Sequence, residues 1–141
     1  MFLEKCRVDG KIAIITGGTR GIGLSIAHAL GEAGAKLVLT NRTDQFGGLE
    51  SLKKAKYDVS FFEGDLLDKS IPQKTIDYTL EKHGRVDILV NNAGIAKHGE
   101  MEDYNDDFLD SIMDINVDAV FRMCRSVITP MKKQGEGTIL N

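Results

Sequence analysis

The stretch Thr16-Gly17-Gly18-Thr19-Arg20-Gly21-Ile22-Gly23 decides the fold, because three of its glycines have the spacing G-x-x-x-G-x-G. It follows a β-branched run at residues 11–16, which lacks polar alternation and is typical of a strand covered on both faces. It precedes residues 22–30, where apolar side chains recur at helical spacing. Glycines let a backbone turn tightly and approach a pyrophosphate, and the N–H groups of a helix N-terminus attract that anion. The stretch therefore predicts a strand, turn and helix that bind a dinucleotide.

Strand-like and helix-like segments alternate along the remainder of the chain. Short apolar runs predict strands at residues 36–40, 59–62, 86–90 and 137–141. Helical patterns cover residues 49–56 and 71–83. A long fourth helix turns six apolar residues inward, namely Phe108, Ile112, Ile115, Val120, Met123 and Val127. This alternation indicates parallel βαβ units in an α/β fold, a Rossmann-like doubly wound parallel sheet.

Several residues predict where the helices begin and end. Gly31 and Gly34 predict the end of the first helix, and Ser70 is the expected N-cap of the helix that has Pro72 in its first turn. The last strand begins just before the chain stops, and an uncovered apolar strand is an unfavourable end for a domain. We therefore expect one nucleotide-binding domain over residues 1–141, truncated at the start of the fifth strand and incomplete at its C-terminus.

The composition suits one globular domain with neither a nucleic-acid nor a membrane partner. Hydrophobic residues make up 42% of the chain, and the net charge of −3 argues against the basic face that nucleic acid requires. No apolar run approaches the length of a membrane span, and the charged residues near Met1 argue against a secretory signal. Cys6 and Cys124 fit no metal spacing. Free thiols in a cytoplasmic protein are expected, with a disulfide as the alternative.

A second motif, Asn91-Asn92-Ala93-Gly94, follows the strand predicted at residues 86–90. Together with residues 16–23, which read Thr-Gly-x-x-x-Gly-x-Gly, it resembles the short-chain dehydrogenase/reductase family over essentially the whole chain. The resemblance implies an enzyme that interconverts a carbonyl and an alcohol by hydride transfer with a nicotinamide cofactor. It extends in general to 3-ketoacyl-carrier-protein reductases and to sugar and polyol dehydrogenases, which the residues do not separate. A small-molecule substrate and a homodimer or homotetramer are also implied.

The resemblance assigns cofactor-binding roles to individual residues. Thr16 would tie the first strand to the loop that contains the second motif. The pyrophosphate would lie on the glycine turn, formed by Gly17, Thr19, Arg20, Gly21, Ile22 and Gly23. Asp65 would accept a hydrogen bond from the adenine amino group, beside the Leu66 backbone. The adenosine ribose side of the cleft would be lined by Asn92, Ala93 and Gly94.

The end of the second strand bears on the choice between NADP(H) and NAD(H). An acidic residue there binds the ribose 2′-hydroxyl and repels a 2′-phosphate, but this strand ends Thr40-Asn41-Arg42. Arg42, with Asn41 beside it and Arg20 in the glycine turn, can form charge-assisted hydrogen bonds to a phosphate. Asp44 offers a weaker route to NAD(H). The sequence therefore favours NADP(H) over NAD(H).

The catalytic residues that the resemblance implies are a serine, a tyrosine with a lysine four positions on, and an asparagine on the long helix. Asn116, in the sequence Asp-Ile-Asn-Val, matches this asparagine, which in the family anchors a water molecule. The other three residues have no match in the chain. Tyr78 and Lys82 have the right spacing, but they lie on the helix before the fourth strand, which we place on the wrong side of the sheet for the cleft. We interpret them as a chance helical pair.

Two classes of function stay open from the sequence. The first is an active reductase whose remaining residues lie beyond Asn141, in which case the 141-residue chain alone is expected to be inactive. The second is a non-catalytic dinucleotide-binding or interaction protein. A metal site is not expected, because His28, His83 and His98 form no ligand cluster.

Overall fold

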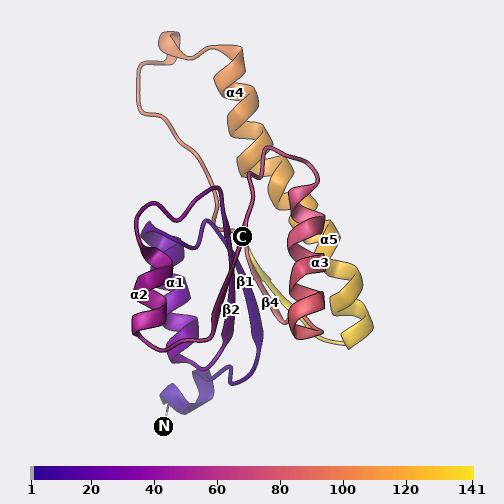
Figure 1. Ribbon diagram of the computed structural model, residues 1–141. Coiled ribbons are helices and arrows are strands. Elements are labelled where there is room, and N and C mark those ends of the chain that lie inside the picture. The colour runs from indigo at the N-terminus through magenta and orange to yellow at the C-terminus, as the bar shows by residue number, and fades with distance from the viewer. Residues whose placement is uncertain (1) are drawn as a thin grey trace.

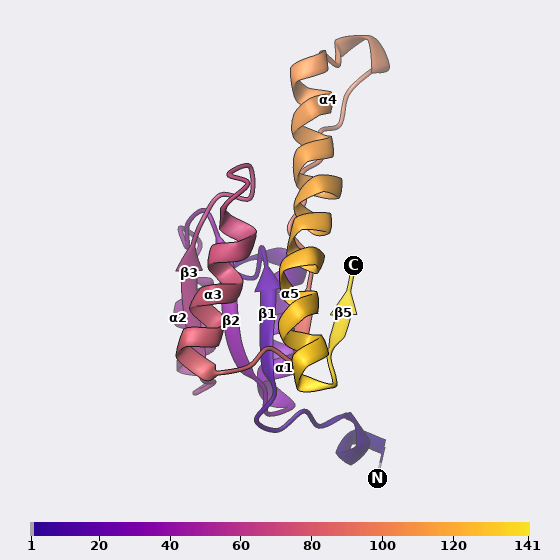
Figure 2. The same cartoon turned by 90° about the vertical axis from the view of Figure 1, so that its right-hand side faces the viewer.

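A five-stranded parallel sheet forms the centre of the computed structural model, which describes residues 2–141. The strands are β1 (Ile12–Thr16), β2 (Lys36–Asn41), β3 (Val59–Glu63), β4 (Ile88–Val90) and β5 (Thr138–Leu140). They lie in the order β3-β2-β1-β4-β5 (Figure 1, Figure 2). The chain therefore winds from β1 out to β3 and then crosses to the other side of β1 at β4. The predicted doubly wound α/β fold is confirmed.

Helices cover both faces of the sheet. One face carries α1 (Gly21–Glu32) and α2 (Gly48–Lys54), and the other carries α3 (Ile71–His83) and α5 (Val120–Gln134) (Figure 1). Successive residues of a strand point to opposite faces, so in β1 Ile14 packs in the core under α3 and α5 while Ile15 packs under α1 and α2. Burial on both sides explains why the strands read as continuous apolar runs.

The long helix of the sequence prediction is built from three parts. These are α4 (Asp106–Met113), the π-helical turn η3 (Asp114–Ala119) and α5. Figure 2 shows that α4 continues the line of α5 well beyond the sheet. Met123 and Val127 are fully buried as expected, whereas the other four residues predicted to face inward are partly buried. The difference arises because the first half of the helix has no strand beneath it.

Two of the predicted helix-end residues act differently from the prediction. Gly34 has a φ of +98° just past the end of α1, as expected, but Gly31 lies inside that helix. A side chain at Gly31 would collide with the ring of Tyr57, so this glycine allows close packing. Ser70 lies at the N-cap position of α3, yet its side chain makes no capping hydrogen bond. Instead the Ser70 N–H donates to the carboxylate of Asp68 at 2.8 Å.

Two short 3-10 turns, η1 (Phe2–Cys6) and η2 (Met101–Asp103), lie outside the layers of the sheet and its covering helices. η1 precedes β1 near the N-terminus, and η2 precedes α4 in the segment that extends beyond the sheet (Figure 1). Within residues 2–141, no helix combines the length and the apolar character needed to cross a membrane.

Asp87 joins the amino-terminal ends of three strands. Its carboxylate is 4% exposed and accepts hydrogen bonds from the Ile12 N–H, at 2.9 Å, and from the guanidinium of Arg85. Lys11 lies 3.6 Å away, and Glu136 accepts from both Lys11 and Arg85 at 2.7 Å. Burial by itself would raise the pKa of Asp87, but the hydrogen bonds from Arg85 and Ile12 and the charges of Arg85 and Lys11 hold this pKa below its ordinary value. The ionised carboxylate therefore stabilises the junction of β1, β4 and the start of β5.

We predict that Asp87→Asn lowers the free energy of unfolding by about 2–3 kcal/mol at pH 7, because it leaves a buried network without its charge. The folded-state pKa of Asp87 is depressed, so this stabilisation is present above the unfolded-state pKa of roughly 4 and is lost as the pH falls through the folded-state pKa. The difference between variant and wild type should therefore shrink below about pH 4. Urea unfolding at a series of pH values measures it.

Asp77→Asn provides a matched control for this change. Asp77 is an exposed carboxylate on α3 that accepts a hydrogen bond from Gln73 at 2.8 Å. Its replacement should change the free energy of unfolding by less than about 0.5 kcal/mol. Equal losses in the two variants would show that the buried network contributes nothing specific.

Candidate functional site

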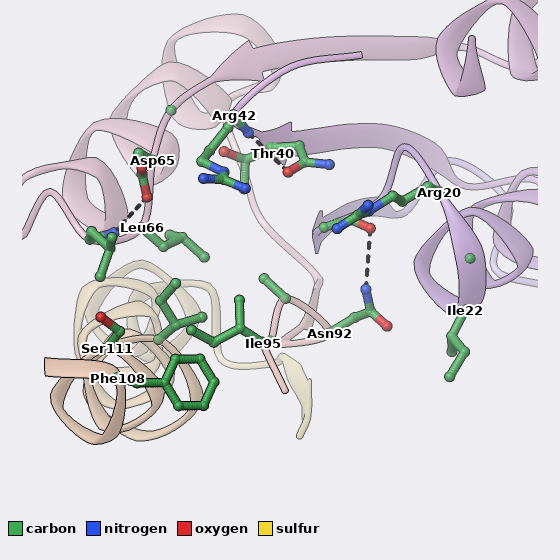
Figure 3. Close-up of a pocket in the computed structure, with 18 residues that line it drawn as sticks. Arg20, Ile22, Thr40, Arg42, Asp65, Leu66, Asn92, Ile95, Phe108 and Ser111 are labelled. Atoms are coloured by element: carbon green, nitrogen blue, oxygen red, sulfur yellow. Dashed lines mark hydrogen bonds between the residues drawn. The ribbon is translucent and has the colours of Figure 1, made fainter. Parts of the chain in front are cut away.

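A cavity of about 530 Å³ opens at the carboxyl ends of the strands, where the order of the sheet reverses between β1 and β4. Open α/β sheets bind ligands at this point, because the loops after neighbouring strands diverge there. Figure 3 shows the cavity between the glycine turn, the ends of β2 and β3, and α4. Eleven of the residues predicted to bind a cofactor line it, namely Gly17, Arg20, Gly21, Ile22, Asn41, Arg42, Asp65, Leu66, Asn92, Ala93 and Gly94.

The glycine turn has the backbone that its sequence predicts. Gly17 and Gly21 have φ values of +65° and +53°, a region that L side chains rarely adopt. Gly23 does not line the cavity; instead it packs so closely on the Gly17 carbonyl and the Asn92 amide that an added Cβ would overlap both. Gly17 and Gly21 therefore shape the turn, and Gly23 lets α1 begin directly against it.

Thr16 connects the glycine turn to the Asn91–Gly94 loop, as the family resemblance implied. Its hydroxyl accepts hydrogen bonds from the N–H groups of Asn92, at 3.0 Å, and Ala93, at 2.9 Å, and lies 3.4 Å from the Val90 carbonyl. The Asn92 side chain donates in return to the carbonyls of Thr16, at 3.0 Å, and Gly17, at 3.2 Å. These hydrogen bonds hold the ends of β1 and β4 together, although the segments that follow the two strands run in different directions.

Thr19 lies beneath the site and does not line the cavity. It is 1% exposed, and its hydroxyl accepts a hydrogen bond from the Asn41 side chain at 2.6 Å while lying 3.3 Å from the Thr43 carbonyl. Asn41 also accepts from the Arg42 N–H at 2.9 Å. Thr19 and Asn41 therefore join the glycine turn to the end of β2 and set the position from which Arg42 projects.

Two arginines give the cavity a positive side. Figure 3 shows Arg42, at the end of β2, on the same side as Arg20 in the glycine turn. The Arg20 guanidinium stacks on the Phe46 ring, 5.4 Å from its centroid. Among residues 2–141 no carboxylate forms an ion pair with either arginine. Asp44 does not line the cavity, because its carboxylate accepts the Leu49 N–H at 3.2–3.3 Å near the start of α2.

Asp65 and Leu66 follow β3 and line the cavity at the end where Arg42 lies (Figure 3). One carboxylate oxygen of Asp65 accepts the Leu67 N–H at 3.0 Å, which shapes the loop. The Leu66 side chain is buried under the sheet with the residues of α3 and α5. The loop therefore places both Asp65 and Leu66 at the cavity.

Sequence reasoning missed the part of the cavity wall that α4 and the neighbouring loops supply. The additional lining residues are Thr40, Gly64, Leu67, Ile95, Phe108, Ser111 and Ile115. The spacing of Phe108, Ser111 and Ile115 places them on one helix face. Two of the three were predicted to face inward, but the sequence does not show that this part of the helix lies beyond the sheet. They therefore face a cavity rather than a core.

Asn116 lies in the π-helical turn η3 and fixes the loop after β4 to the long helix. Its amide oxygen accepts the Ile95 N–H and its amide nitrogen donates to the Ile95 carbonyl, both at 2.9 Å. The Gly94 Cα also packs against it, since a Cβ there would lie 3.3 Å from the Asn116 oxygen. A π-turn accommodates an extra residue and releases a main-chain carbonyl from the α-helical pattern, and such turns are frequent at functional sites.

The tyrosines and histidines lie outside the cavity lining. Tyr78 packs against Phe62 in the core, with Lys82 above its ring. The prediction that this pair lies on the wrong side of the sheet is incorrect, because α3 and α5 share a face; the pair is remote from the cavity because Tyr78 points into the core. No group of three potential metal ligands occurs in the described part of the chain.

Comparisons with known proteins identify the family. A family model described as short chain dehydrogenase matches residues 11–141. The chain is 40% identical over 137 residues to the NADP-dependent (R)-specific alcohol dehydrogenase of Lentilactobacillus kefiri, covering 96% of this chain and 54% of the relative. It is 39% identical over 140 residues to the 3alpha-hydroxysteroid dehydrogenase of Mediterraneibacter gnavus, covering 95% and 55%.

A solved structure gives the same result. The gluconate 5-dehydrogenase of Burkholderia cenocepacia, in complex with NADP and tartrate, superposes with a TM-score of 0.87 at 33% identity, covering 99% of this chain and 55% of that one. The chain thus spans about half the length of the curated relatives it matches. With the glycine turn, the Asn91–Gly94 loop and the sheet order in their places, the chain belongs to the short-chain dehydrogenase/reductase family.

Proposed function

We propose that the protein is an NADP(H)-dependent oxidoreductase that interconverts a small-molecule carbonyl and alcohol by hydride transfer. The observation that carries this proposal is the glycine turn, which is held against Asn92 at the point where the sheet order reverses. No Cβ fits at Gly23, so the backbone of the turn and the start of α1 stay close together. This cradle fits a pyrophosphate, which would take the N–H groups at the start of α1.

We propose that the dinucleotide lies along the cavity in one direction. We assign the pyrophosphate to residues 17–23, with Thr19 and Gly23 supporting the turn from beneath. Asp65 and the Leu66 backbone would bind the adenine, and Asn92, Ala93 and Gly94 would line the adenosine ribose side. Figure 3 shows Asp65 and Ile22 at opposite ends of the cavity, as an extended dinucleotide requires. A bound nicotinamide group would supply or accept the hydride.

The preference for NADP(H) over NAD(H) rests on charge. Arg20 and Arg42 lie on the same side of the cavity, and neither forms an ion pair within residues 2–141. Asp44, the one alternative that favoured NAD(H), is engaged by the Leu49 N–H at the start of α2. A 2′-phosphate placed beside Arg42 would therefore meet positive charge. Asp65 is the one carboxylate among residues 2–141 that lines the cavity.

Arg42→Asp should reverse the preference between the two cofactors. The new carboxylate would repel a 2′-phosphate and accept hydrogen bonds from a 2′-hydroxyl, so affinity for NADPH should fall by roughly 10- to 100-fold while affinity for NADH rises. Fluorescence titration of the reduced cofactors measures both dissociation constants. Lys133→Asp, an exposed charge reversal at the end of α5, is the control and should change neither. Unchanged relative affinities in Arg42→Asp would refute the NADP(H) assignment.

Asn116 positions the catalytic side of the site in this proposal. Its amide is engaged on both sides by the Ile95 backbone, so it holds the loop after β4 against the helix. We assign the water-anchoring role of the family asparagine to the main-chain carbonyl that the π-turn releases. The π-turn would thus position both the Asn116 side chain, which holds the loop, and the main-chain carbonyl, which would bind the water molecule.

The proton donor for carbonyl reduction must be a group other than the three tyrosines of this chain. Tyr57 packs on Gly31, Tyr78 packs on Phe62, and Tyr104 donates to the Lys97 carbonyl. None of them lines the cavity. Hydride delivery to a ketone needs a proton donor beside the developing alkoxide. We therefore infer that the residues present bind the cofactor and that the reaction needs a proton donor other than these tyrosines.

The 141-residue chain alone should accordingly bind NADPH and catalyse no carbonyl reduction. Equilibrium titration would measure the binding, and absorbance of NADPH in the presence of a panel of ketones would measure turnover. NADPH oxidation that depends on a ketone would contradict the prediction. A longer form of the protein with a serine and a Tyr-x-x-x-Lys sequence after Asn141 should be active; inactivity of such a form would favour the alternative, a non-catalytic dinucleotide-binding protein.

We also propose that the protein assembles through the long helix, as a homodimer or homotetramer. Its outer face exposes an apolar stripe, defined by Leu109, Met113, Val117 and Phe121. These side chains recur every four residues and are 48–63% exposed. Large exposed apolar patches mark contact surfaces, because water contact with them is unfavourable. Cytoplasmic location is part of the same proposal and is consistent with two free thiols.

Phe121→Glu should weaken this assembly, because it places a charge in the middle of the apolar contact. Light scattering after size-exclusion chromatography would show a shift toward the mass of a single chain, and the dissociation constant should rise by at least 10-fold. Met101→Glu changes an apolar residue outside the stripe that is more exposed than Phe121, and it is the control. A single-chain mass for the wild-type protein would refute the proposed assembly.

A further inference from the structure

We propose that the Thr40 hydroxyl is a hydrogen-bonding group for the adenosine ribose and its 2′-phosphate, and that it sets the affinity of this half of the cofactor. The proposal rests on the proposed function, since it takes the ligand of the cavity to be a dinucleotide. It adds a residue of β2 to the site. Neither a sequence motif nor the family resemblance indicated a role for this residue.

Thr40 differs from the other buried hydroxyl residues in having no hydrogen-bond partner. The side chain is 1% exposed, and its oxygen finds no partner among residues 2–141. Every other buried serine or threonine hydroxyl has one; these residues are Thr16, Thr19, Ser60, Thr75 and Thr79. A buried polar atom without a partner costs free energy, so its retention calls for a partner from outside the chain.

The position of Thr40 on β2 places its side chain at the edge of the cavity. Residues two apart on a strand point to the same face, and Val38 packs in the core under α3 and α5. Thr40 therefore points to that same face, one step nearer the end of β2, where the core gives way to the cavity. Its neighbours in the sheet are Thr16 and Phe62. Thr16 already has its bonds to the loop after β4, so neither neighbour satisfies Thr40.

The surroundings of Thr40 fit the adenosine half of a dinucleotide. Figure 3 shows Thr40 next to Arg42 at the end of the cavity that contains Asp65, with Ile22 at the far end. The Thr40 carbonyl accepts the Gly17 N–H at 2.8 Å, which fixes the backbone against the glycine turn. A threonine hydroxyl both donates and accepts, so it can bond to a ribose hydroxyl or to a phosphate oxygen. Arg42 would supply the charge for that phosphate, and Thr40 a directed hydrogen bond.

Replacing Thr40 by valine separates binding from folding, because valine has the shape of threonine without the hydroxyl. In the protein without cofactor, Thr40→Val removes an unpaired buried oxygen and should raise Tm by about 3 °C. With cofactor, it should weaken binding of NADP⁺ and of adenosine 2′,5′-bisphosphate by the same factor, roughly five-fold. Isothermal titration calorimetry measures the affinities, and thermal unfolding measures Tm.

Two further variants make the result specific. Thr40→Ser keeps the hydroxyl and should retain the affinity of the wild type for both ligands. Thr75→Val removes a buried hydroxyl that donates to the Ile71 carbonyl at 2.8 Å in α3, remote from the cavity. This control should leave both affinities unchanged and should not raise Tm, because it deletes a hydrogen bond that is already made. If Thr40→Val does not fold, Thr40→Ala removes the same oxygen and serves for the binding comparison.

The outcomes distinguish this inference from the function on which it rests. Wild-type affinity in Thr40→Val, or a loss for NADP⁺ without a matching loss for the bisphosphate, overturns the role of Thr40 and leaves the proposed function standing. Failure of the wild-type protein to bind either ligand overturns both. Weaker binding of both ligands together with a higher Tm supports the inference, since a purely structural hydroxyl would not move the two measurements in opposite senses.

Discussion

The close approach of the glycine turn to the Asn91–Gly94 loop is the constraint on which the remaining structure depends. β1 and β4 are neighbours in the sheet, but the chain leaves them in different directions, and a gap opens between their ends. Thr16 and Asn92 close its base with four hydrogen bonds between the two segments. Gly23 makes the approach possible, because any side chain there would separate α1 from the turn. The same contact closes the bottom of the cavity and leaves main-chain N–H groups at its surface.

The buried ionic network and the candidate site lie at opposite ends of the sheet. The amino ends of the strands are tied by the buried carboxylate of Asp87 with Arg85, Lys11 and the main chain of Ile12. The charged side chains of that network form ion pairs with one another. At the carboxyl ends Arg42 has no ion pair in the described chain, and Thr40 has no hydrogen-bond partner there. Unsatisfied groups of this kind are tolerated where a ligand can satisfy them, and the network at the other end offsets part of their cost.

One long helix supports several features of the site. Phe108 and Ser111 on α4 and Ile115 on η3 form a wall of the cavity, while the apolar stripe lies on the exposed outer face of the same long helix. Between α4 and α5 the π-turn places Asn116 against the Ile95 backbone. A shift of the helix would therefore move the cavity wall and the loop after β4 together. Assembly through the stripe would hold that helix in position, which links the proposed oligomer to the shape of the cofactor site.

The sequence by itself determined the sheet, the glycine turn and most of the residues that line the cavity. These depend on local patterns: continuous apolar runs for strands buried on both faces, and glycines where the backbone must turn or pack closely. Local patterns did not predict the role of a residue whose sequence context is compatible with more than one structure. Gly31 resembled a helix end but lies inside α1 because Tyr57 packs on it, and Asp44 resembled a ribose ligand but is engaged at the start of α2.

The tertiary structure alone decided which side of the long helix faces the cavity and which buried hydroxyl lacks a partner. The apolar spacing of Phe108 and Ile115 is the same for a core and for a cavity wall, and the outcome depends on whether a strand lies beneath the helix. Thr40 reads as one more β-branched residue of a buried strand. Whether its hydroxyl is satisfied depends on neighbours from β1 and β3, which are distant in the chain and meet only in the folded sheet.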